Sequence, residues 1–454
     1  MRVSELQNLL RDLELRPDRK LGQNFLIDDN VARWIVEQLR IAPSDVVIEV
    51  GPGAGALTKH LVGRCRRLIL IEKDPKLADH IENHYRRHGW HFEVVRGDAV
   101  EHDIRPLFRE GRVKLIGNLP YSAGTEIMRT FLTPPTPVAE AVVMVQREVA
   151  DRICAGPRSK DYGVLSLMLQ EVWHPQLLKT VKPPIFYPQP EVDSAVVHFA
   201  PRAADDFPPH SPQTFEEIVK KGFSRRRKQL HNNLEIHADK WASIAKKANL
   251  APTARAEELS LQRWINLSNI LEKHPCRKQT GNGDEIFDVV DKRDNVTGRA
   301  TRADVHERKL LHRAVHVFLF NKEGELYLQK RSHLKDSHPG RWDSSASGHL
   351  DTGERYADAA HRELKEELMV RPRKPLERLG KIAAGPGTDW EFIELYRCEY
   401  GGKVRTHGNE VATGGFFPLE EIADWVDDRP QDFATGFVTC FRWFVVNVLA
   451  KGSA

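Results

Sequence analysis

The first part of the chain alternates short apolar runs with amphipathic segments, and the apolar runs recur at regular intervals. Val46–Val50 is an apolar run interrupted by one acid, which is typical of a parallel strand buried on both faces. The amphipathic segments Val31–Leu39 and Ala56–Leu61 predict helices. Further strands are predicted at Arg67–Ile71, Phe92–Val95, Val113–Ile116 and Ala141–Val145. This alternation predicts an α/β fold with a doubly wound sheet.

Polar residues follow the predicted strands at the point where each one ends. The first strand runs into Gly51–Gly55, a turn rich in glycine that lets a backbone approach a ligand closely. Glu72 follows Gly51 by 21 residues, and its carboxylate can accept from both hydroxyls of a ribose. Asp98 ends the third strand and can accept from an adenine amine. These residues predict one crevice for an adenosine-containing cofactor, and at this point a dinucleotide and S-adenosylmethionine are both possible.

The fourth strand ends in Gly117–Tyr121, which reads Gly-Asn-Leu-Pro-Tyr. The amine of adenine is a poor nucleophile because its lone pair is delocalised, so an enzyme that alkylates it must hold the N–H groups with acceptors. Asn118 offers an amide oxygen, a carbonyl beside Pro120 offers a second acceptor, and Tyr121 offers a face for stacking a base. An ordinary turn at a strand end has the same composition. The neighbouring carboxylates favour the interpretation as a methylation site.

Six motifs together resemble one family across residues 19 to about 272, the KsgA/RsmA group of small-subunit rRNA adenine dimethyltransferases. They are Gln23–Leu26, Glu49–Gly53, Gly97–Ala99, Asn118–Tyr121, Gln146–Val149 and Phe186–Ser194. The resemblance implies a Rossmann-like methyltransferase sheet and two methyl groups added to each of two adjacent adenosines near the 3′ end of 16S rRNA. It implies that S-adenosylmethionine is bound by Asn24, Leu26, Gly51, Glu72, Asp98 and Asn118.

Two further features bear on the RNA substrate. Phe186 could clamp the second face of the target base, or it could be a core residue of a strand. Related macrolide-resistance methylases of 23S rRNA usually carry Ile where Leu119 stands, and they lack the arginine block described next. The 16S substrate is therefore preferred.

A basic segment follows Pro201–Pro212, which has the composition of a linker. Phe215–Leu234 is predicted to be a helix and resembles the small helical domain of the same family. Residues 1–270 carry a net charge of +5 and residues 271–454 a net charge of −1. Six cations stand within nine residues without an acid, which favours phosphate contacts over a merely solvated face. They are Lys220, Lys221, Arg225, Arg226, Arg227 and Lys228, and the last four are the predicted RNA-binding residues.

The C-terminal part contains a second set of motifs. His316–Phe320 and Glu325–Lys330 predict a strand pair. Further on, Glu363, Glu366 and Glu367 stand at positions i, i+3 and i+4 of a predicted helix, so they share one face. Carboxylate oxygens suit Mg²⁺, which can neutralise a diphosphate and activate a water molecule.

With Gly348, Glu354 and Arg362, these acids resemble the Nudix box. The resemblance implies an α/β/α Nudix hydrolase domain that uses Mg²⁺ and acts on a small molecule containing a diphosphate. Met369 stands where the box normally has Gly, which questions the local turn more than the metal site. The surrounding sequence looks like the branch near isopentenyl-diphosphate isomerase, but Ser347 stands where the essential cysteine would fall, so hydrolysis is favoured over isomerisation.

The predicted organisation is a methyltransferase domain at 1–205, a helical rRNA-binding domain at 206–272, a linker at 273–284 and a Nudix domain at 285–454. Five scattered cysteines without a CxxC pair fit a reducing cytoplasm. No run of about 18 apolar residues occurs, so no membrane partner is expected. Two alternatives stay open. The chain could be a ribosome-assembly factor without catalysis, or a Nudix hydrolase whose first part targets it to RNA.

Overall fold

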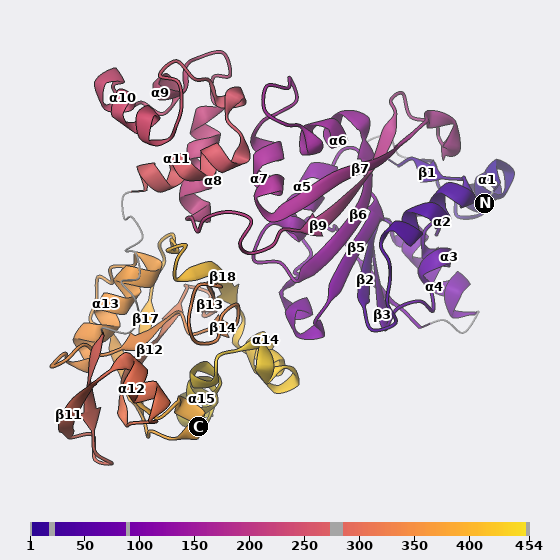
Figure 1. The fold of residues 1–454 in the computed structure, drawn as a ribbon. Helices are drawn as coiled ribbons and strands as arrows, with labels where there is room; N and C mark the ends of the chain where they lie inside the picture. The colour runs from indigo at the N-terminus through magenta and orange to yellow at the C-terminus, as the bar shows by residue number, and fades with distance from the viewer. Residues whose placement is uncertain (1, 18–22, 88–90, 273–284, 451–454) are drawn as a thin grey trace. The chain divides into compact units, whose positions relative to one another are not determined.

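The computed structural model describes residues 2–17, 23–87, 91–272 and 285–450. The chain forms two compact units, one of Met1–Asp206 with Val219–Trp264 and the other of Phe207–Ile218 with Ile265–Ala454. Each unit contains its own seven-stranded sheet (Figure 1). The predicted linker at 273–284 lies outside the described residues. Among those residues, no helix has the length and apolar character needed to cross a bilayer.

The sheet of the first unit has the strand order β4-β3-β2-β5-β6-β9-β7. Its first five strands are parallel, and β9 runs antiparallel to both of its neighbours. The five strands predicted from the apolar runs are confirmed. The strands are β2 (Val46–Val50), β3 (Arg67–Glu72), β4 (Glu93–Arg96), β5 (Val113–Asn118), β6 (Val138–Gln146), β7 (Trp173–Val181) and β9 (Ser194–Pro201).

Helices cover both faces of this sheet, as Figure 1 shows. On one face α2 (Asp29–Gln38), α3 (Thr58–Leu61) and α4 (Pro75–Arg86) bury apolar side chains against β2 and β3. On the other face lie α5 (Gly124–Leu132), α6 (Arg147–Cys154) and α7 (Val164–Val172). Val46–Val50 is buried at every position, as expected of a strand covered on both faces, and its one acid, Glu49, accepts a hydrogen bond from Thr58 Oγ1 at 2.8 Å. Outside the sheet are α1 (Val3–Asp12) and the strand pair of β1 (Phe25–Leu26) with β8 (Phe186–Tyr187).

The basic segment differs from its prediction as one continuous helix. Helix α8 (Pro212–Gly222) ends at Gly222, turns follow, and α9 begins at Leu230. A Cβ on Gly222 would lie 2.3 Å from the ring of Trp264, so a glycine is needed where the two segments meet. Asn233 Nδ2 donates to the carbonyls of Gly222 and Arg225, at 2.6 and 3.1 Å, and so satisfies the end of the helix. The remaining helices here are α9 (Leu230–Asn233), α10 (Ala238–Lys247) and α11 (Leu261–Leu271).

The second unit is built around the strand order β14-β13-β12-β17-β16, with β15 paired to β12 and β18 paired to β13. The predicted strand pair is confirmed, since β12 and β13 are antiparallel and pair at Phe320 and Leu326. The strands are β12 (His312–Phe320), β13 (Leu326–Arg331), β14 (Trp342–Asp343), β15 (Ala346–His349), β16 (Glu377–Ile382), β17 (Glu391–Glu399) and β18 (Val411–Phe417).

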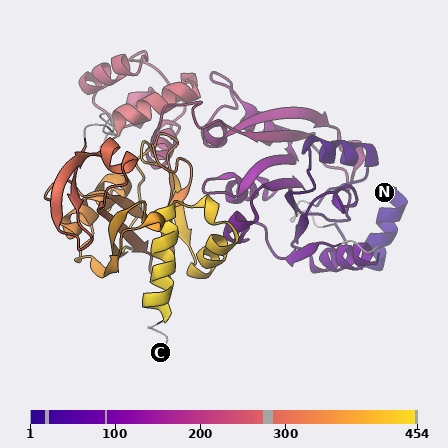
Figure 2. The same cartoon turned by 60° about the horizontal axis from the view of Figure 1, so that its bottom comes forward.

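Helices again cover the two faces of this sheet. Helix α13 (Tyr356–Leu368) packs on one face through Ala360, Leu364 and Leu368. On the other face α15 (Thr435–Phe444) packs the rings of Phe437, Phe441 and Phe444 around Phe318 of β12 in tilted and edge-on contacts. Figure 2 shows this helix running toward the C-terminus. The unit also contains β10 (Ile286–Val290), β11 (Val296–Thr301), α12 (Arg302–Glu307) and α14 (Leu419–Asp428). Short 3₁₀ helices span Arg105–Glu110, Pro183–Ile185, Ala256–Glu258, Pro386–Thr388 and Pro430–Asp432, and a π-helical turn spans Val445–Leu449.

Candidate functional sites

A cavity of about 190 Å³ lies in the first unit at the carboxyl ends of the parallel strands. Open α/β sheets bind their ligands at this edge because the loops that follow the strands converge there. The cavity brings together all six predicted cofactor-binding residues, of which Asn118 is also a predicted catalytic residue, and two further predicted catalytic ones. Its lining includes Asn24, Leu26, Gly51, Glu72, Asp98, Asn118, Pro120 and Tyr121.

The two predicted cofactor-binding carboxylates of this cavity are held in different ways. Glu72 is buried, its Oε2 accepts from the Gly53 N–H at 3.0 Å, and its Oε1 accepts from the Asp74 N–H at 2.9 Å. Burial raises the pKa of Glu72. Asp98 instead pairs with Lys73 Nζ at 2.7 Å, which lowers the pKa of Asp98. Each oxygen of Glu72 keeps further acceptor capacity, so both can accept from a ligand.

The glycine-rich turn brings backbone close to the cavity. Gly51 and Gly53 have φ values of +66° and +56°, a left-handed conformation that other residues adopt only at a cost. A Cβ on Gly53 would stand 3.2 Å from the ring of Phe25. The N–H of Gly53 is also one of the two backbone N–H groups that donate to Glu72. The glycines therefore let β1, the turn and the end of β3 converge.

The side-chain amide of Asn118 is oriented by a hydrogen bond to the backbone. Its Nδ2 donates to the Asn24 carbonyl at 2.9 Å, which leaves Oδ1 as the acceptor of that amide. The Pro120 carbonyl already accepts from the N–H groups of Ala123 and Gly124, at 3.1 and 2.8 Å. The carbonyl next to Pro120 that can serve a ligand is therefore that of Leu119.

Two aromatic side chains of the motifs have different surroundings. Tyr121 lines the cavity, and its hydroxyl bonds to Ser194 Oγ, which fixes the ring. Phe186 is 3% exposed and packs in a core that includes Leu26 and Met144. It is not among the residues that line the cavity. The structure does not bring Phe186 together with the other predicted site residues, and its role as a clamp stays a prediction.

The four predicted RNA-binding cations lie in the turns between α8 and α9. Arg225, Arg227 and Lys228 are exposed. Arg226 differs, since its Nε donates to Glu257 at 2.7 Å and its Nη2 donates to the Ser159 carbonyl at 2.8 Å. Arg226 therefore joins parts of its own unit, whereas its three neighbours point their charge to solvent.

A larger cavity, of about 490 Å³, lies in the second unit. The face of α13 that lines it carries all three predicted metal-binding acids, Glu363, Glu366 and Glu367. Glu363 and Glu367 are buried, and burial raises the pKa of both, whereas Glu366 is more exposed. Two buried carboxylates on one helix face are costly without a cation, so this arrangement suits a metal ion.

Neighbouring residues shape the acidic cluster. A Cβ on Gly348 would lie 2.1 Å from Glu363 Oε1, so a larger residue there would displace this carboxylate. Arg362 joins the parts of the motif, since it donates to both oxygens of Glu354, at 3.0 and 2.9 Å, to Glu363 at 2.6 Å and to the His349 carbonyl at 2.9 Å. These contacts explain why a glycine, a glutamate and an arginine accompany the acids in sequence.

Three residues that the sequence did not point to also act on the cluster. Gln329 Nε2 donates to Glu367 Oε2 at 2.8 Å. Lys335 Nζ lies 3.7 Å from Glu367 and forms an ion pair with Glu410. Burial by itself would lower the pKa of Lys335, but the two carboxylates raise it. No local pattern could reveal these residues, because each is more than 30 positions from Glu367 in sequence.

The two departures from the motif have structural counterparts. Met369 ends α13 with φ 54° and ψ 23°, and its N–H donates to the Leu364 carbonyl. The turn that normally uses glycine is thus formed with methionine in the left-handed region, at some cost in strain. Ser347 lines the cavity, where its N–H donates to Glu367 at 3.1 Å and its Oγ to Asp343 at 3.3 Å.

Comparison with known proteins identifies a family for each part of the chain. Residues 15–273 match the family model of the ribosomal RNA adenine dimethylases, and residues 310–435 match that of the NUDIX domain. The chain is 36% identical over 262 residues to Ribosomal RNA small subunit methyltransferase A of Francisella tularensis subsp. novicida, covering 56% of this chain and 97% of that one. It is 37% identical over 263 residues to the protein of that name from Chlorobium phaeobacteroides strain BS1, covering 58% and 96%.

Among solved structures, the 23S rRNA methyltransferase ErmE is 25% identical, covers 55% of this chain and 99% of its own, and has a TM-score of 0.44. The sheet and cavity of the first unit, with the family match, define an S-adenosylmethionine-dependent methyltransferase. The chain belongs to the ribosomal RNA adenine dimethylase family and carries a Nudix domain after it.

Proposed function

We propose that this protein dimethylates N6 of two adjacent adenosines near the 3′ end of 16S rRNA, during small-subunit assembly in the cytoplasm. The observation that carries the proposal is the single cavity that joins Glu72, Asp98 and Asn118 to Pro120 and Tyr121. The relatives named above methylate small-subunit rRNA by name. A factor that had lost catalysis would have no need to keep the acceptors of this cavity.

The residues of the cavity fit S-adenosylmethionine. Both oxygens of Glu72 can accept ribose hydroxyls while they hold backbone N–H groups, and Asp98 can accept an adenine amine. When bound, the cofactor supplies an electrophilic methyl group. Asn24, Leu26 and Gly51 would complete its binding surface.

The chain's own residues orient the nucleophile. Asn118 Oδ1 and the Leu119 carbonyl accept the N–H groups of the target amine, so that its lone pair localises and points into the cavity. Tyr121 offers its ring for stacking, and the bond to Ser194 keeps that ring in place. The proton can leave after attack, so the step depends on alignment and exclusion of water more than on a strong base.

The test is to incubate the full chain with labelled S-adenosylmethionine and small subunits that lack the modification. We expect two methyl groups on each of two neighbouring adenosines, located by digestion and mass spectrometry. Subunits that already carry the modification and large subunits serve as matched controls. Label in 23S rRNA would instead show that the substrate is in the large subunit. Cofactor binding without any transfer would favour the assembly factor.

We propose further that the second unit is a Mg²⁺-dependent hydrolase of a small molecule containing a diphosphate. Glu363, Glu366 and Glu367 would hold the ion, which supplies charge neutralisation and an activated water. The space that Gly348 leaves for Glu363 supports this fit. Cations on the cavity wall, among them Arg302 and Lys335, would favour a phosphorylated ligand.

A panel of nucleoside diphosphate derivatives and isopentenyl diphosphate tests this second activity, with phosphate release and isomer formation scored separately. We expect Mg²⁺-dependent phosphate release and no isomer, because Ser347 supplies no thiol. Isomer formation would contradict the inference from Ser347. If hydrolysis were present and methyl transfer absent, the first part would be an RNA-targeting module for the Nudix domain.

A further inference from the structure

The second unit includes one segment, Phe207–Ile218, that is far in sequence from the rest of it. This segment lies within the residues that match the dimethylase family and outside those that match the NUDIX domain. Its partner is the loop of residues 403–410, which stands between β17 and β18. We call the two the docked segment and the cavity loop. Glu217 of the first and Arg405 of the second are in contact although 188 positions separate them.

The closest approach between them is at Gly408 of the cavity loop. A Cβ on this residue would lie 2.3 Å from the carbonyl oxygen of His210 and 2.6 Å from its backbone nitrogen. The φ of Gly408 lies outside the left-handed region, so the backbone of the loop does not itself require a glycine. A glycine is needed here because the docked segment lies directly against it.

Side chains of the docked segment hold the loop on both sides of this point. Gln213 Oε1 accepts from the N–H and the hydroxyl of Thr406, each at 3.4 Å, and Thr406 is fully buried. Glu217 Oε1 accepts from Arg405 Nη2 at 2.6 Å and from Lys403 Nζ at 3.4 Å. Burial alone would raise the pKa of Glu217, but the two cations lower it. Because half-exposed ion pairs contribute little, the buried contact of Gln213 is the firmer attachment.

The opposite side of the cavity loop is bonded to the end of α13. The His407 N–H donates to the Glu367 carbonyl at 3.1 Å, and the Arg405 N–H donates to the Leu368 carbonyl at 3.3 Å. The last carbonyls of a helix have no partner within it, so the loop satisfies two of them. The loop is therefore held between the docked segment and the helix that carries the acidic cluster.

Glu410, the last residue of the loop, determines the charge next to this cluster. It lines the cavity and pairs with Lys335, whose Nζ also lies 3.7 Å from Glu367. If the loop moved away, Lys335 would lose Glu410 and keep only Glu367 as an ion-pair partner. Its ammonium would then neutralise a carboxylate that is predicted to hold a metal ion.

We propose that the docked segment is a positioning element of the Nudix site. It holds the cavity loop against α13, and through Glu410 and Lys335 it raises the affinity of the acidic cluster for Mg²⁺. The inference rests on the proposed hydrolase, because the acids must hold a cation for this effect to exist. The Nudix site would then be complete only with a segment that belongs by sequence to the dimethylase, which gives a reason for joining the two in one chain.

The experiment uses the full chain and loosens the contact from each side. Gly408→Ala places a methyl group against the backbone of His210. Gln213→Ala removes the acceptor of Thr406, and Gln213 does not line the cavity. Gly298→Ala is the matched control, since a Cβ on Gly298 would meet nothing within 4 Å and its φ is outside the left-handed region.

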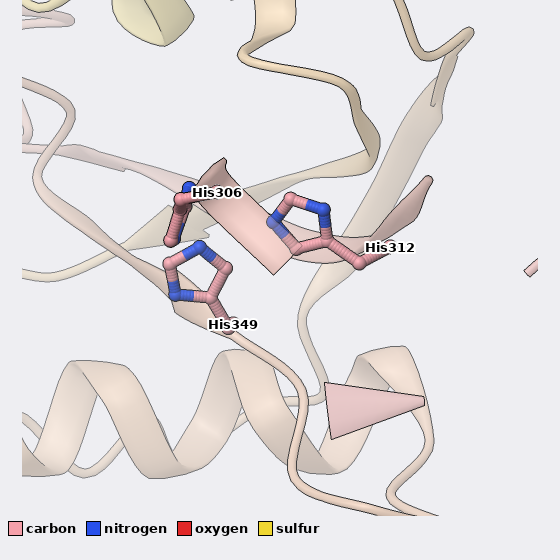
Figure 3. Close-up of side chains that lie close together, drawn as sticks. All are labelled: His306, His312 and His349. Atoms are coloured by element: carbon pink, nitrogen blue, oxygen red, sulfur yellow. The ribbon is translucent and has the colours of Figure 1, made fainter. Parts of the chain in front are cut away.

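Two measurements read the outcome, and neither requires turnover. Hydrogen exchange of the Arg405 and His407 amides reports whether the loop stays on α13. Mn²⁺ binding, followed by electron paramagnetic resonance, reports the acidic cluster, and only the part that Glu367→Gln removes is assigned to it. The other wall of the cavity includes His349, whose ring lies beside those of His306 and His312 (Figure 3). These rings are outside the docked segment and the loop, so the variants leave them unchanged.

We expect both amides to exchange ~10-fold faster in Gly408→Ala and in Gln213→Ala, and the Kd for Mn²⁺ to rise by ~5-fold. Gly298→Ala should behave as the wild type. Unchanged exchange in both variants would overturn the inference, and so would faster exchange with unchanged Mn²⁺ affinity. If Gly408→Ala fails to fold by circular dichroism, Gln213→Ala gives the decisive measurement. A wild-type protein whose Mn²⁺ binding does not depend on Glu367 would overturn the proposed hydrolase as well, so the two failures are distinct.

Discussion

The predicted site acids of the two cavities differ in their surroundings. In the first unit, Glu72 accepts two backbone N–H groups and Asp98 pairs with Lys73, so each charge has a fixed partner. In the second unit, Glu363 and Glu367 lie buried on the same helix, where burial raises the pKa of both, as it also raises that of Glu72. We call the first site, where backbone N–H groups and a lysine hold the acids, the geometric site. We call the second site, where three acids gather on one helix face, the charge-storing site. The difference indicates that an organic cofactor needs only alignment from the protein, whereas a metal needs charge kept at some cost.

The largest effect is expected at the charge-storing site. Glu367→Gln keeps the shape of the side chain and removes one ligand charge, so Mg²⁺-dependent phosphate release should fall by ~10³-fold. Glu366→Gln should also reduce the rate. Methyl transfer should be unchanged, because each cavity is lined by residues of one unit. Glu420→Gln, an exposed acid of α14, is the control. Equal losses in Glu420→Gln and Glu367→Gln would contradict the metal-binding role of the acidic cluster.

At the geometric site the central residue is Asn118. Asn118→Ala removes the acceptor that orients the amine, so the rate of methyl transfer should fall by ~10²-fold or more while RNA binding survives. The measurement is single-turnover methyl transfer to unmodified small subunits. Turnover near that of the wild type would contradict the role given to this amide.

Glu72→Ala should separate cofactor binding from orientation of the target amine within the same cavity. It removes the acceptors of the ribose without touching the target amine, so the KM for S-adenosylmethionine should rise by ~10-fold or more. The rate at saturating cofactor should change less than in Asn118→Ala. An unaltered affinity for the cofactor, measured by calorimetry, would show that the ribose lies elsewhere.

The four cations Arg225–Lys228, in the turns between α8 and α9, provide an electrostatic comparison. Replacing Arg225 and Arg227 together should reduce the salt dependence of RNA binding by up to about two units of slope, because each exposed cation releases counterions. Arg226→Ala is the contrasting variant. It breaks the contacts to Glu257 and Ser159 and should lower the melting temperature instead. An unchanged slope in the double variant, with its fold intact, would mean that the run is a solvated surface.

The smallest expected effect concerns pH. Because the pKa values of Glu363 and Glu367 are raised above the usual 4.5, the folded protein keeps protons that the unfolded chain releases. The stability of the metal-free protein should therefore fall as the pH rises from 4.5 toward neutrality. Added Mg²⁺ should reverse the decline, since it takes over the role of the protons. Melting curves with chelator and with Mg²⁺ test this, and parallel pH profiles would contradict it.

Much of the architecture could be predicted because it depends on local pattern. Val46–Val50 is apolar apart from Glu49, as expected of a strand in a doubly covered sheet, and Glu72 and Asn118 line one cavity because parallel strands end at one edge. The close approach of Gly222 to the ring of Trp264 could not be predicted, since the two residues are 42 positions apart. The same limit applies to the contact of Gln329 with Glu367 and to the convergence of His306, His312 and His349.

Lys335 gives the charge-storing site a property of its own. Its ammonium lies between Glu367 and Glu410, on a side chain that cannot diffuse away. It is a tethered competitor for any free cation, and its effective concentration does not depend on the solution. Mg²⁺ from solution must therefore compete with the Lys335 ammonium, which is always present. When no Mg²⁺ is bound, Glu367 therefore still has a positive charge 3.7 Å away.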